Sequence, residues 1–247
     1  MPVFTDSPAM PSQAIGGTNY GFSAARIEDL GATEYTLGLV VIDVSGSTSG
    51  FRREMEKALK EIVKACRRNP RADNMMLRVV LFDDKVQEFH GFKPLPSCNE
   101  NDYDGCLGTS GGMTALYDAT YNAVKSATQY GAQLVASDFD VNAVVFIITD
   151  GGDNASKVTR NMVKTALEEG VLGESLESLN SILIGLGGTR LDQYLKGLQA
   201  ECGITQYVGI ANANEKSLAK LGDFISKSVS STSQALGTGG VSQSLAF

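Results

Sequence analysis

Five oxygen-bearing side chains stand where they could together hold a metal ion. Three of them alternate in the segment Asp43-Val-Ser45-Gly-Ser47, and steps of two residues let a turning loop direct three oxygens at one point. Thr114 follows a Gly-Gly-Met run, and Asp150 precedes a pair of glycines. Two carboxylates and three hydroxyls suit a hard divalent cation such as Mg²⁺, which prefers oxygen ligands.

Two apolar strands are expected to place the two carboxylates. Residues 36–43 and 142–150 are apolar runs that each end in an aspartate, as is typical of central strands buried on both faces. Strands alternate with helical patterns along the chain, which indicates a parallel sheet covered by helices on both faces. Ligands of such sheets bind at the carboxyl ends of the strands. The sequence therefore predicts that Asp43 and Asp150 lie at the same edge of one sheet.

The remaining elements follow the same alternation. A tight turn at Asp83-Asp84 separates strands expected at 76–82 and 85–92, so the second is expected to be antiparallel and to lie at an edge. Further strands are expected at 181–185 and 206–209. Helices are expected at 50–69, from 116 toward 134, at 155–169, at 190–200 and at 214–229. The predicted fold is α/β, a doubly wound and mainly parallel six-stranded sheet with one antiparallel edge strand and helices on both faces.

The two ends of the chain differ from its middle in composition. Residues 1–34 are rich in Pro, Ser, Gly and Thr without periodicity, and are expected to form an extended arm with weak local structure. Residues 230–247 form a Ser/Gly-rich segment, expected to be a flexible or partner-ordered tail. The expected division is therefore an arm, a domain at 35–229 and a tail.

The motifs resemble those of the von Willebrand factor type A (vWA) domain family. The D-x-S-G-S segment at Asp43, a later Thr at a helix start and a strand-ending Thr-Asp-Gly are similar to that family's metal-ion-dependent adhesion site, and all five positions are present in order. The resemblance covers about residues 36–229 and implies a Rossmann-like fold. The N-terminal arm, the long 93–112 loop and the Ser/Gly tail depart from the family pattern.

The resemblance also implies a function. Ser45, Ser47 and Thr114 would contact Mg²⁺ through their hydroxyls, while Asp43 and Asp150 would act directly or through water; Mn²⁺ or Ca²⁺ could replace Mg²⁺. An Asp or Glu of a protein partner would complete the coordination, without catalysis. Intracellular members of the family occur in bacteria and phages, and the chain is similar to that group.

Composition excludes several other classes of function. The chain has 247 residues and a net charge of −7, which argues against nucleic acid and against an anionic membrane surface as partners. A single histidine, His90, excludes a zinc site built on two or more histidines. No secretory signal is recognisable, and no apolar run is long enough to span a bilayer. The expected location is cytoplasmic, with the four cysteines as free thiols.

Structural alternatives exist for several of these residues. Ser45 and Ser47 could cap the helix that follows them, and capping of the next helix is favoured over metal ligation for Asp153 and Asn154. His90 is expected to be a packed or solvated residue of the edge strand. Either of the pairs Arg52-Arg53 and Arg67-Arg68 is expected on a solvated helix face or in contact with an acidic partner. Other side chains are expected to serve turns or helix ends: Asp83, Asp84 and Asp118.

Two other functions compete with the interaction module. The chain could be a structural subunit of a larger assembly, of a phage or stress-response type, in which the arm and tail connect neighbouring copies. It could also be a metal-assisted hydrolase, although no convincing general base lies near the predicted site and His90 is poorly placed.

Overall fold

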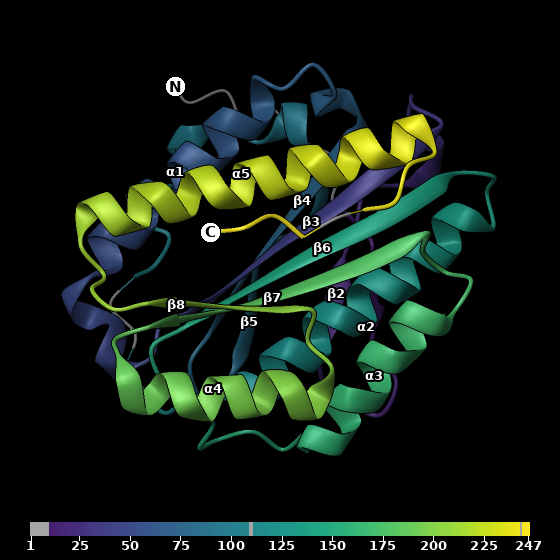
Figure 1. Cartoon of the computed structure of the whole chain (residues 1–247). Coiled ribbons are helices and arrows are strands. Elements are labelled where there is room, and N and C mark those ends of the chain that lie inside the picture. The colour runs from purple at the N-terminus through teal and green to yellow at the C-terminus, as the bar shows by residue number, and fades with distance from the viewer. Residues whose placement is uncertain (1–9, 109–110, 243) are drawn as a thin grey trace, which may run out of the picture.

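A six-stranded sheet forms the centre of the computed structural model, which describes residues 10–108, 111–242 and 244–247 (Figure 1). Its strands lie in the order β5-β4-β3-β6-β7-β8, and only the β4–β5 pair is antiparallel. Their bounds are β3 Glu34–Asp43, β4 Met75–Phe82, β5 Val86–Pro94, β6 Asp140–Thr149, β7 Ser178–Leu186 and β8 Gln206–Ile210. The predicted fold class is confirmed, including its antiparallel edge strand.

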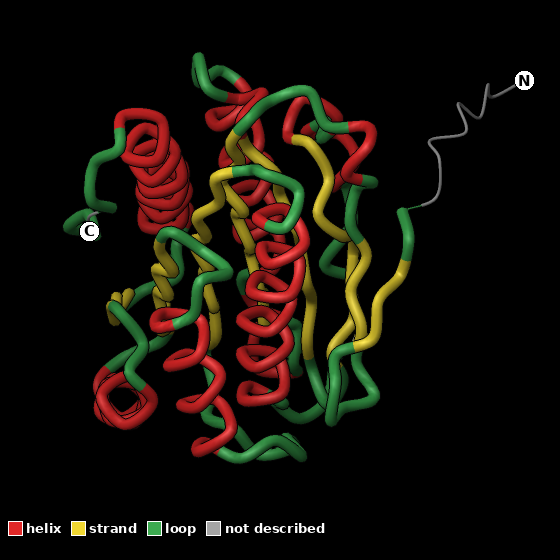
Figure 2. Tube along the Cα trace, turned by 90° about the vertical axis from the view of Figure 1, so that its right-hand side faces the viewer, coloured by secondary structure: helices red, strands yellow, loops and turns green. Residues whose placement is uncertain are grey.

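Helices cover both faces of the sheet (Figures 1 and 2). One face packs against α1 and α5, and the other against α2, α3 and α4. Alternate residues of β3 serve the two cores, with Leu39 and Val41 in one and Val40 and Ile42 in the other. The bounds are α1 Arg52–Arg67, α2 Leu116–Val135, α3 Arg160–Leu172, α4 Thr189–Cys202 and α5 Glu215–Thr238. No helix of the described residues combines the length and apolarity that a membrane crossing requires.

The described part of the N-terminal arm is more ordered than its sequence indicates. Residues 12–14 (β1, Ser12–Ala14) and 21–23 (β2, Gly21–Ser23) form an antiparallel hairpin, and the side chains of Ile15 and Phe22 are buried in the core shared with α2. Ala24 then forms a bridge to strand β5. The expectation of weak local structure is wrong for residues 10–34, because long-range burial and not local periodicity orders this hairpin. Residues 1–9 lie outside the described part.

The last helix also differs from its predicted bounds. Helix α5 was expected at 214–229 but continues to Thr238, nine residues into the segment expected to be a tail. The small side chains of Thr232 and Ser233 are buried against the sheet, and the carbonyl of Thr232 accepts a hydrogen bond from Asn142 of β6 (2.8 Å). Packing against the sheet therefore outweighs the modest helix propensity of serine and threonine.

A buried arginine connects the hairpin, the edge strands and α2. The side chain of Arg78 in β4 is fully buried, and its Nε donates to Glu88 of β5 (2.7 Å). Its Nη1 donates to Asn122 (3.0 Å) and Ser126 (2.9 Å) of α2. Glu88 also accepts from the backbone N–H of Ser23 in β2 (2.9 Å). The charge of Arg78 is thus paired with Glu88, and each of its three nitrogens has a hydrogen-bond partner, since Nη2 donates to the carbonyl of Gly21 (3.4 Å).

His90 is a packed residue of the edge strand, as expected. Its ring is half-buried and has hydrogen-bond partners at both nitrogens, the carbonyl of Gly91 at Nδ1 (2.9 Å) and the hydroxyl of Tyr103 at Nε2 (2.8 Å). A neutral ring protonated at Nδ1 satisfies both contacts, because it donates to the carbonyl and accepts from the hydroxyl. Burial lowers the pKa of His90 to about 4.

The lowered pKa of His90 predicts a loss of stability in acid. Between pH 6.5 and 4 the unfolded chain binds a proton that the folded chain does not, so stability is full above pH 6.5 and falls as the pH falls toward 4. We expect His90 to account for about 3 kcal/mol of the decrease between pH 7.5 and pH 4. Urea unfolding of wild type and His90→Gln at the two pH values measures this contribution. An equal decrease in both proteins would contradict it.

Candidate metal centre

Neighbouring strand ends bring Asp43 and Asp150 to the same edge of the sheet. Asp43 is the last residue of β3, and Asp150 follows the last residue of its parallel neighbour β6. Ser45 and Ser47 lie in the turn after β3, where their hydroxyls are 3.2 Å apart. The Ser47 hydroxyl donates to Oδ1 of Asp150 (2.6 Å). Oxygens from two strand ends therefore form one continuous chain of contacts.

The Asp43 carboxylate holds the loop that carries the serines. Its Oδ1 accepts from the backbone N–H of Ser45 (2.8 Å), and its Oδ2 accepts from the hydroxyl of Thr149 at the end of β6 (2.6 Å). Asp43 and Ser45 are both buried, whereas Ser47 is exposed and Asp150 is half-buried. The site therefore opens to solvent on the side of Ser47 and Asp150.

The Thr114 hydroxyl lies next to the loop that follows β6. A Cβ built on Gly151 would lie 3.3 Å from its Oγ1, so this hydroxyl is adjacent to the residue that follows Asp150. Thr114 is 4% exposed, and within the described part of the chain its hydroxyl makes no hydrogen bond. The oxygen is not among the fully buried unpartnered atoms of the described residues, so a ligand can approach it from solvent. A cation bound beside it would satisfy this oxygen.

The electrostatics of the two carboxylates also fit a cation. Burial raises the pKa of Asp43, hydrogen bonds from Ser45 and Thr149 oppose this effect, and the nearby Asp83 raises the pKa further. Burial likewise raises the pKa of Asp150, the hydrogen bond from Ser47 opposes it, and the charge of Asp43 adds to it. Two partly desolvated carboxylates that repel each other are stabilised by a divalent cation between them.

Asp153 and Asn154 cap a different helix from the expected one. The side chain of Asn154 accepts from the backbone N–H of Thr114 (2.7 Å), and that of Asp153 accepts from the backbone N–H of Tyr117 (3.2 Å). Both therefore cap the start of α2, whereas α3 is capped by Thr159. The expectation was wrong because the loop after β6 folds back over α2 and fixes the position of Thr114. The capping alternative for Ser45 and Ser47 gains no support, since no side chain caps the start of α1.

Arg52 is a residue of the site that sequence reasoning missed. It was expected on a solvated helix face, but its Nη2 donates to the carbonyls of Val44 (2.5 Å) and Ser45 (2.9 Å). Its Nε also reaches the hydroxyl of Thr48 (3.3 Å). Arg52 therefore fixes the backbone of the serine-bearing loop. Its position directly after that loop was the one signal in the sequence.

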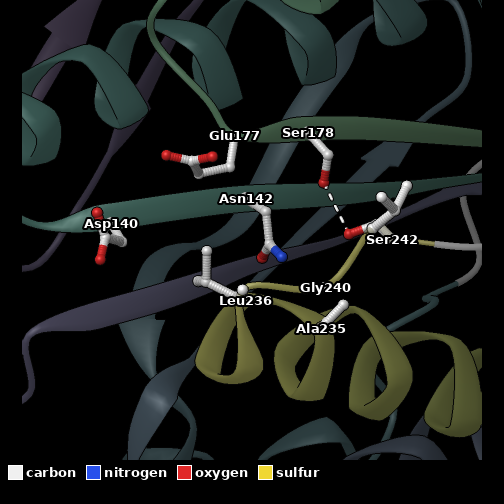
Figure 3. A pocket seen from close by; sticks show the side chains of 10 residues that line it. Asp140, Asn142, Glu177, Ser178, Ala235, Leu236, Gly240 and Ser242 are labelled. Carbon is white, nitrogen blue, oxygen red and sulfur yellow. Dashed lines mark hydrogen bonds between the residues drawn. The ribbon is translucent and has the colours of Figure 1, made fainter.

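A partly open cavity lies at the other end of the strands (Figure 3). Its volume is about 420 Å³, and it lies between the starts of β6 and β7 and the end of α5. Its labelled lining residues are Asp140, Asn142, Glu177, Ser178, Ala235, Leu236, Gly240 and Ser242. The five oxygen-bearing residues do not line this cavity. They lie instead at an open edge, which suits the surface of another protein better than an enclosed small molecule.

Comparisons with known proteins support the fold. No protein-family model matches the chain, and no curated protein matches it by sequence. A D319A mutant of the PilB minor pilin from Streptococcus sanguinis has a similar structure, with a TM-score of 0.61, 15% identity and coverage of 85% of this chain and 64% of the pilin. The SpaC pilus adhesin from Lactobacillus rhamnosus GG has a TM-score of 0.53 and 11% identity, over 81% of this chain and 31% of the adhesin.

A third similar structure carries an occupied metal site. It is proximal thread matrix protein 1 (PTMP1) from the mussel byssus, described with a zinc-occupied MIDAS motif, where MIDAS stands for metal-ion-dependent adhesion site. Its TM-score is 0.53 at 19% identity, over 80% of this chain and 46% of the mussel protein. The chain spans less than two thirds of the length of each of these three proteins. Sheet order, helix placement and these neighbours together show that the chain has a Rossmann-like, vWA-like fold.

Proposed function

We propose that this chain is a non-catalytic protein-interaction module that binds an acidic residue of its partner through a Mg²⁺-type cation. The observation that carries the proposal is the chain of contacts from Ser45 through Ser47 to Asp150, with the unpartnered hydroxyl of Thr114 beside it. Asp43 holds the first residue of this series in place, because its carboxylate accepts a hydrogen bond from the Ser45 backbone N–H.

Neutral hydroxyls determine how a cation at this site would behave. Ser45, Ser47 and Thr114 would contact it through uncharged oxygens, and Asp43 and Asp150 would act directly or through water. A first shell with little negative charge leaves the cation able to attract one more anionic ligand. Since Ser47 is exposed and Asp150 half-buried, that ligand would enter on their side. An Asp or Glu carboxylate of another protein fits this position.

A bound cation would also offset the negative charge of the protein locally. At a net charge of −7, the chain repels acidic partners at long range. A bound divalent ion reverses the sign of the potential locally. Acidic partners would therefore bind only while the metal is present. Mg²⁺ is the proposed ion, with Mn²⁺ and Ca²⁺ as alternatives; the zinc of the PTMP1 structure supports divalent binding at a comparable fold.

No specific observation favours either competing function, the structural subunit or the metal-assisted hydrolase. The described arm residues pack on their own chain, through Ile15 and Phe22, so they do not support a role in connecting neighbouring copies. His90 is hydrogen-bonded at both ring nitrogens on the edge strand, which gives no support to a general base at the metal site. Assembly through the metal-dependent surface itself remains compatible with the proposed function.

Binding of an acidic peptide with and without Mg²⁺ tests the proposal. A fluorescent peptide with one Asp in a neutral sequence should bind the wild type in Mg²⁺ and be released by EDTA. Thr114→Val removes one hydroxyl that makes no hydrogen bond with the described residues, and it should weaken binding. Thr128→Val, a matched change on the middle of α2, should leave binding unchanged. Equal peptide binding in Mg²⁺ and EDTA would sink the proposal.

Substitution of Arg52 is expected to weaken metal binding indirectly. Arg52→Met removes the donors to the Val44 and Ser45 carbonyls and loosens the loop that presents the serine hydroxyls. Loss of such a supporting group costs roughly 10-fold or more in metal affinity. Calorimetric titration with Mg²⁺ measures the effect, with Arg68→Met at the far end of α1 as the matched control. An unchanged dissociation constant for Arg52→Met would show that the loop holds its shape alone.

A further inference from the structure

A second cavity lies next to the proposed metal site. Its volume is about 570 Å³, and it begins two residues after Ser47, where the turn leads into α1. Its lining residues are Ser49, Gly50, Arg52, Arg53, Glu54 and Gly108. Arg52 belongs to both places, since it lines this cavity and also donates to the carbonyl of Ser45. A partner bound at the metal would therefore lie directly beside this cavity.

The cavity carries an excess of positive charge in an otherwise acidic protein. Its lining contains two arginines and one glutamate, whereas the whole chain has a net charge of −7. Arg52 is bonded to loop carbonyls, but the Arg53 guanidinium is exposed and has no hydrogen bond or ion pair with any of the residues that the structure describes. An exposed guanidinium of this kind presents a planar set of donors that matches a carboxylate.

We infer that the partner segment carries two acidic residues, one for the metal and a second for Arg53. This inference rests on the proposed function, because the first carboxylate is the one that the cation binds. An extended peptide advances about 3.3 Å per residue, so a second carboxylate within a few positions of the first can reach the neighbouring cavity. Ser49 lines the same cavity and carries a hydroxyl of the donor type that a carboxylate accepts from. Partners with paired acidic residues are thereby selected over those with one.

Two peptides that differ in one charge test the inference. The first contains Gly-Asp-Gly-Glu-Gly and the second Gly-Asp-Gly-Gln-Gly, in the same neutral host sequence. In Mg²⁺ we expect the wild type to bind the doubly acidic peptide about three- to fivefold more tightly, the range of a partly exposed ion pair. Arg53→Gln should abolish this preference. Arg68→Gln changes the same charge at the far end of α1 and should preserve it.

The outcomes separate this inference from the proposed function. If the wild type binds both peptides equally in Mg²⁺ and EDTA releases both, the second carboxylate site is refuted and the metal-dependent function stands. If neither peptide responds to Mg²⁺, the proposed function itself fails. A preference that persists in Arg53→Gln at low salt would assign the second carboxylate to another residue. A preference that disappears in 1 M NaCl, while metal-dependent binding persists, would support the ion pair.

Discussion

Asp43→Asn is expected to lose the stabilisation that Mg²⁺ gives to the wild-type protein, while its own stability in EDTA stays equal to that of the wild type or rises. An ion that binds only the folded state stabilises it by about 2.7 kcal/mol at a concentration 100 times its dissociation constant. Without the Asp43 charge, the remaining hydroxyls and Asp150 should hold the ion far more weakly.

The expected stability in EDTA follows from the contacts of Asp43. The Asn side-chain carbonyl can still accept from the backbone N–H of Ser45, and its amide can donate to the hydroxyl of Thr149, which has the Gly151 carbonyl as an alternative acceptor (3.1 Å). The substitution also removes a buried negative charge that raises the pKa of Asp150. Relief of this repulsion offsets the weaker hydrogen bonding.

Thermal unfolding at several Mg²⁺ concentrations and in EDTA measures both effects. The wild-type melting temperature should rise with Mg²⁺, and that of Asp43→Asn should not. Asp140→Asn is a matched control, because Asp140 is an exposed carboxylate at the opposite end of β6. If Mg²⁺ raised the melting temperature of Asp43→Asn as much as that of the wild type, Asp43 would have no part in metal binding. A large loss of stability in EDTA would contradict the contacts described above.

Arg78→Met is expected to cause the largest loss of stability among single substitutions far from the metal site. Removing one partner of a buried ion pair typically costs about 3–5 kcal/mol, because the other charge is left without compensation. Glu88 would lose its ionic partner, and Asn122 and Ser126 would lose their shared donor. The N-terminal hairpin depends on the same group, since Glu88 also binds the Ser23 backbone.

Urea unfolding of four proteins tests this expectation. Arg78→Met should be strongly destabilised, and the double variant Arg78→Met/Glu88→Gln should recover part of the loss because it leaves no unpaired charge. Arg68→Met is the exposed control and should unfold like the wild type. A loss below about 1 kcal/mol in Arg78→Met would mean that water replaces the arginine at low cost.

The central strands, and the meeting of Asp43 and Asp150 at one edge of the sheet, were predictable because local sequence encodes them. Strands β3 and β6 are buried on both faces, so each is an apolar run, and each run ends where Asp43 and Asp150 stand. Because β3 and β6 are parallel and adjacent in the sheet, their carboxyl ends lie side by side. Only the position of Thr114 depends on a distant segment, since the loop containing Asn154 fixes it.

The parts that were predicted wrongly depend on contacts between distant residues. The hairpin at residues 12–23 is ordered by burial of Phe22 and by polar contacts to β5 and α2. Its two strands are too short to show a hydrophobic pattern in the sequence. Helix α5 continues through a serine- and threonine-rich sequence because Thr232 is buried and its carbonyl binds Asn142 of β6. Arginine is most often a surface residue. The carbonyl acceptors of Arg52 come together only when the loop after β3 folds.

Anomalous diffraction from crystals grown in Mn²⁺ would locate a cation bound at the proposed site. We expect one manganese peak at the open edge of the sheet, within about 2.0–2.3 Å of the Ser45 and Ser47 hydroxyl oxygens, the distance typical of small divalent ions bound by oxygen. The same peak should disappear in Asp43→Asn. A peak located only at Asp140 and Glu177, in the cavity of Figure 3, or no peak at a saturating concentration, would contradict the proposed metal site.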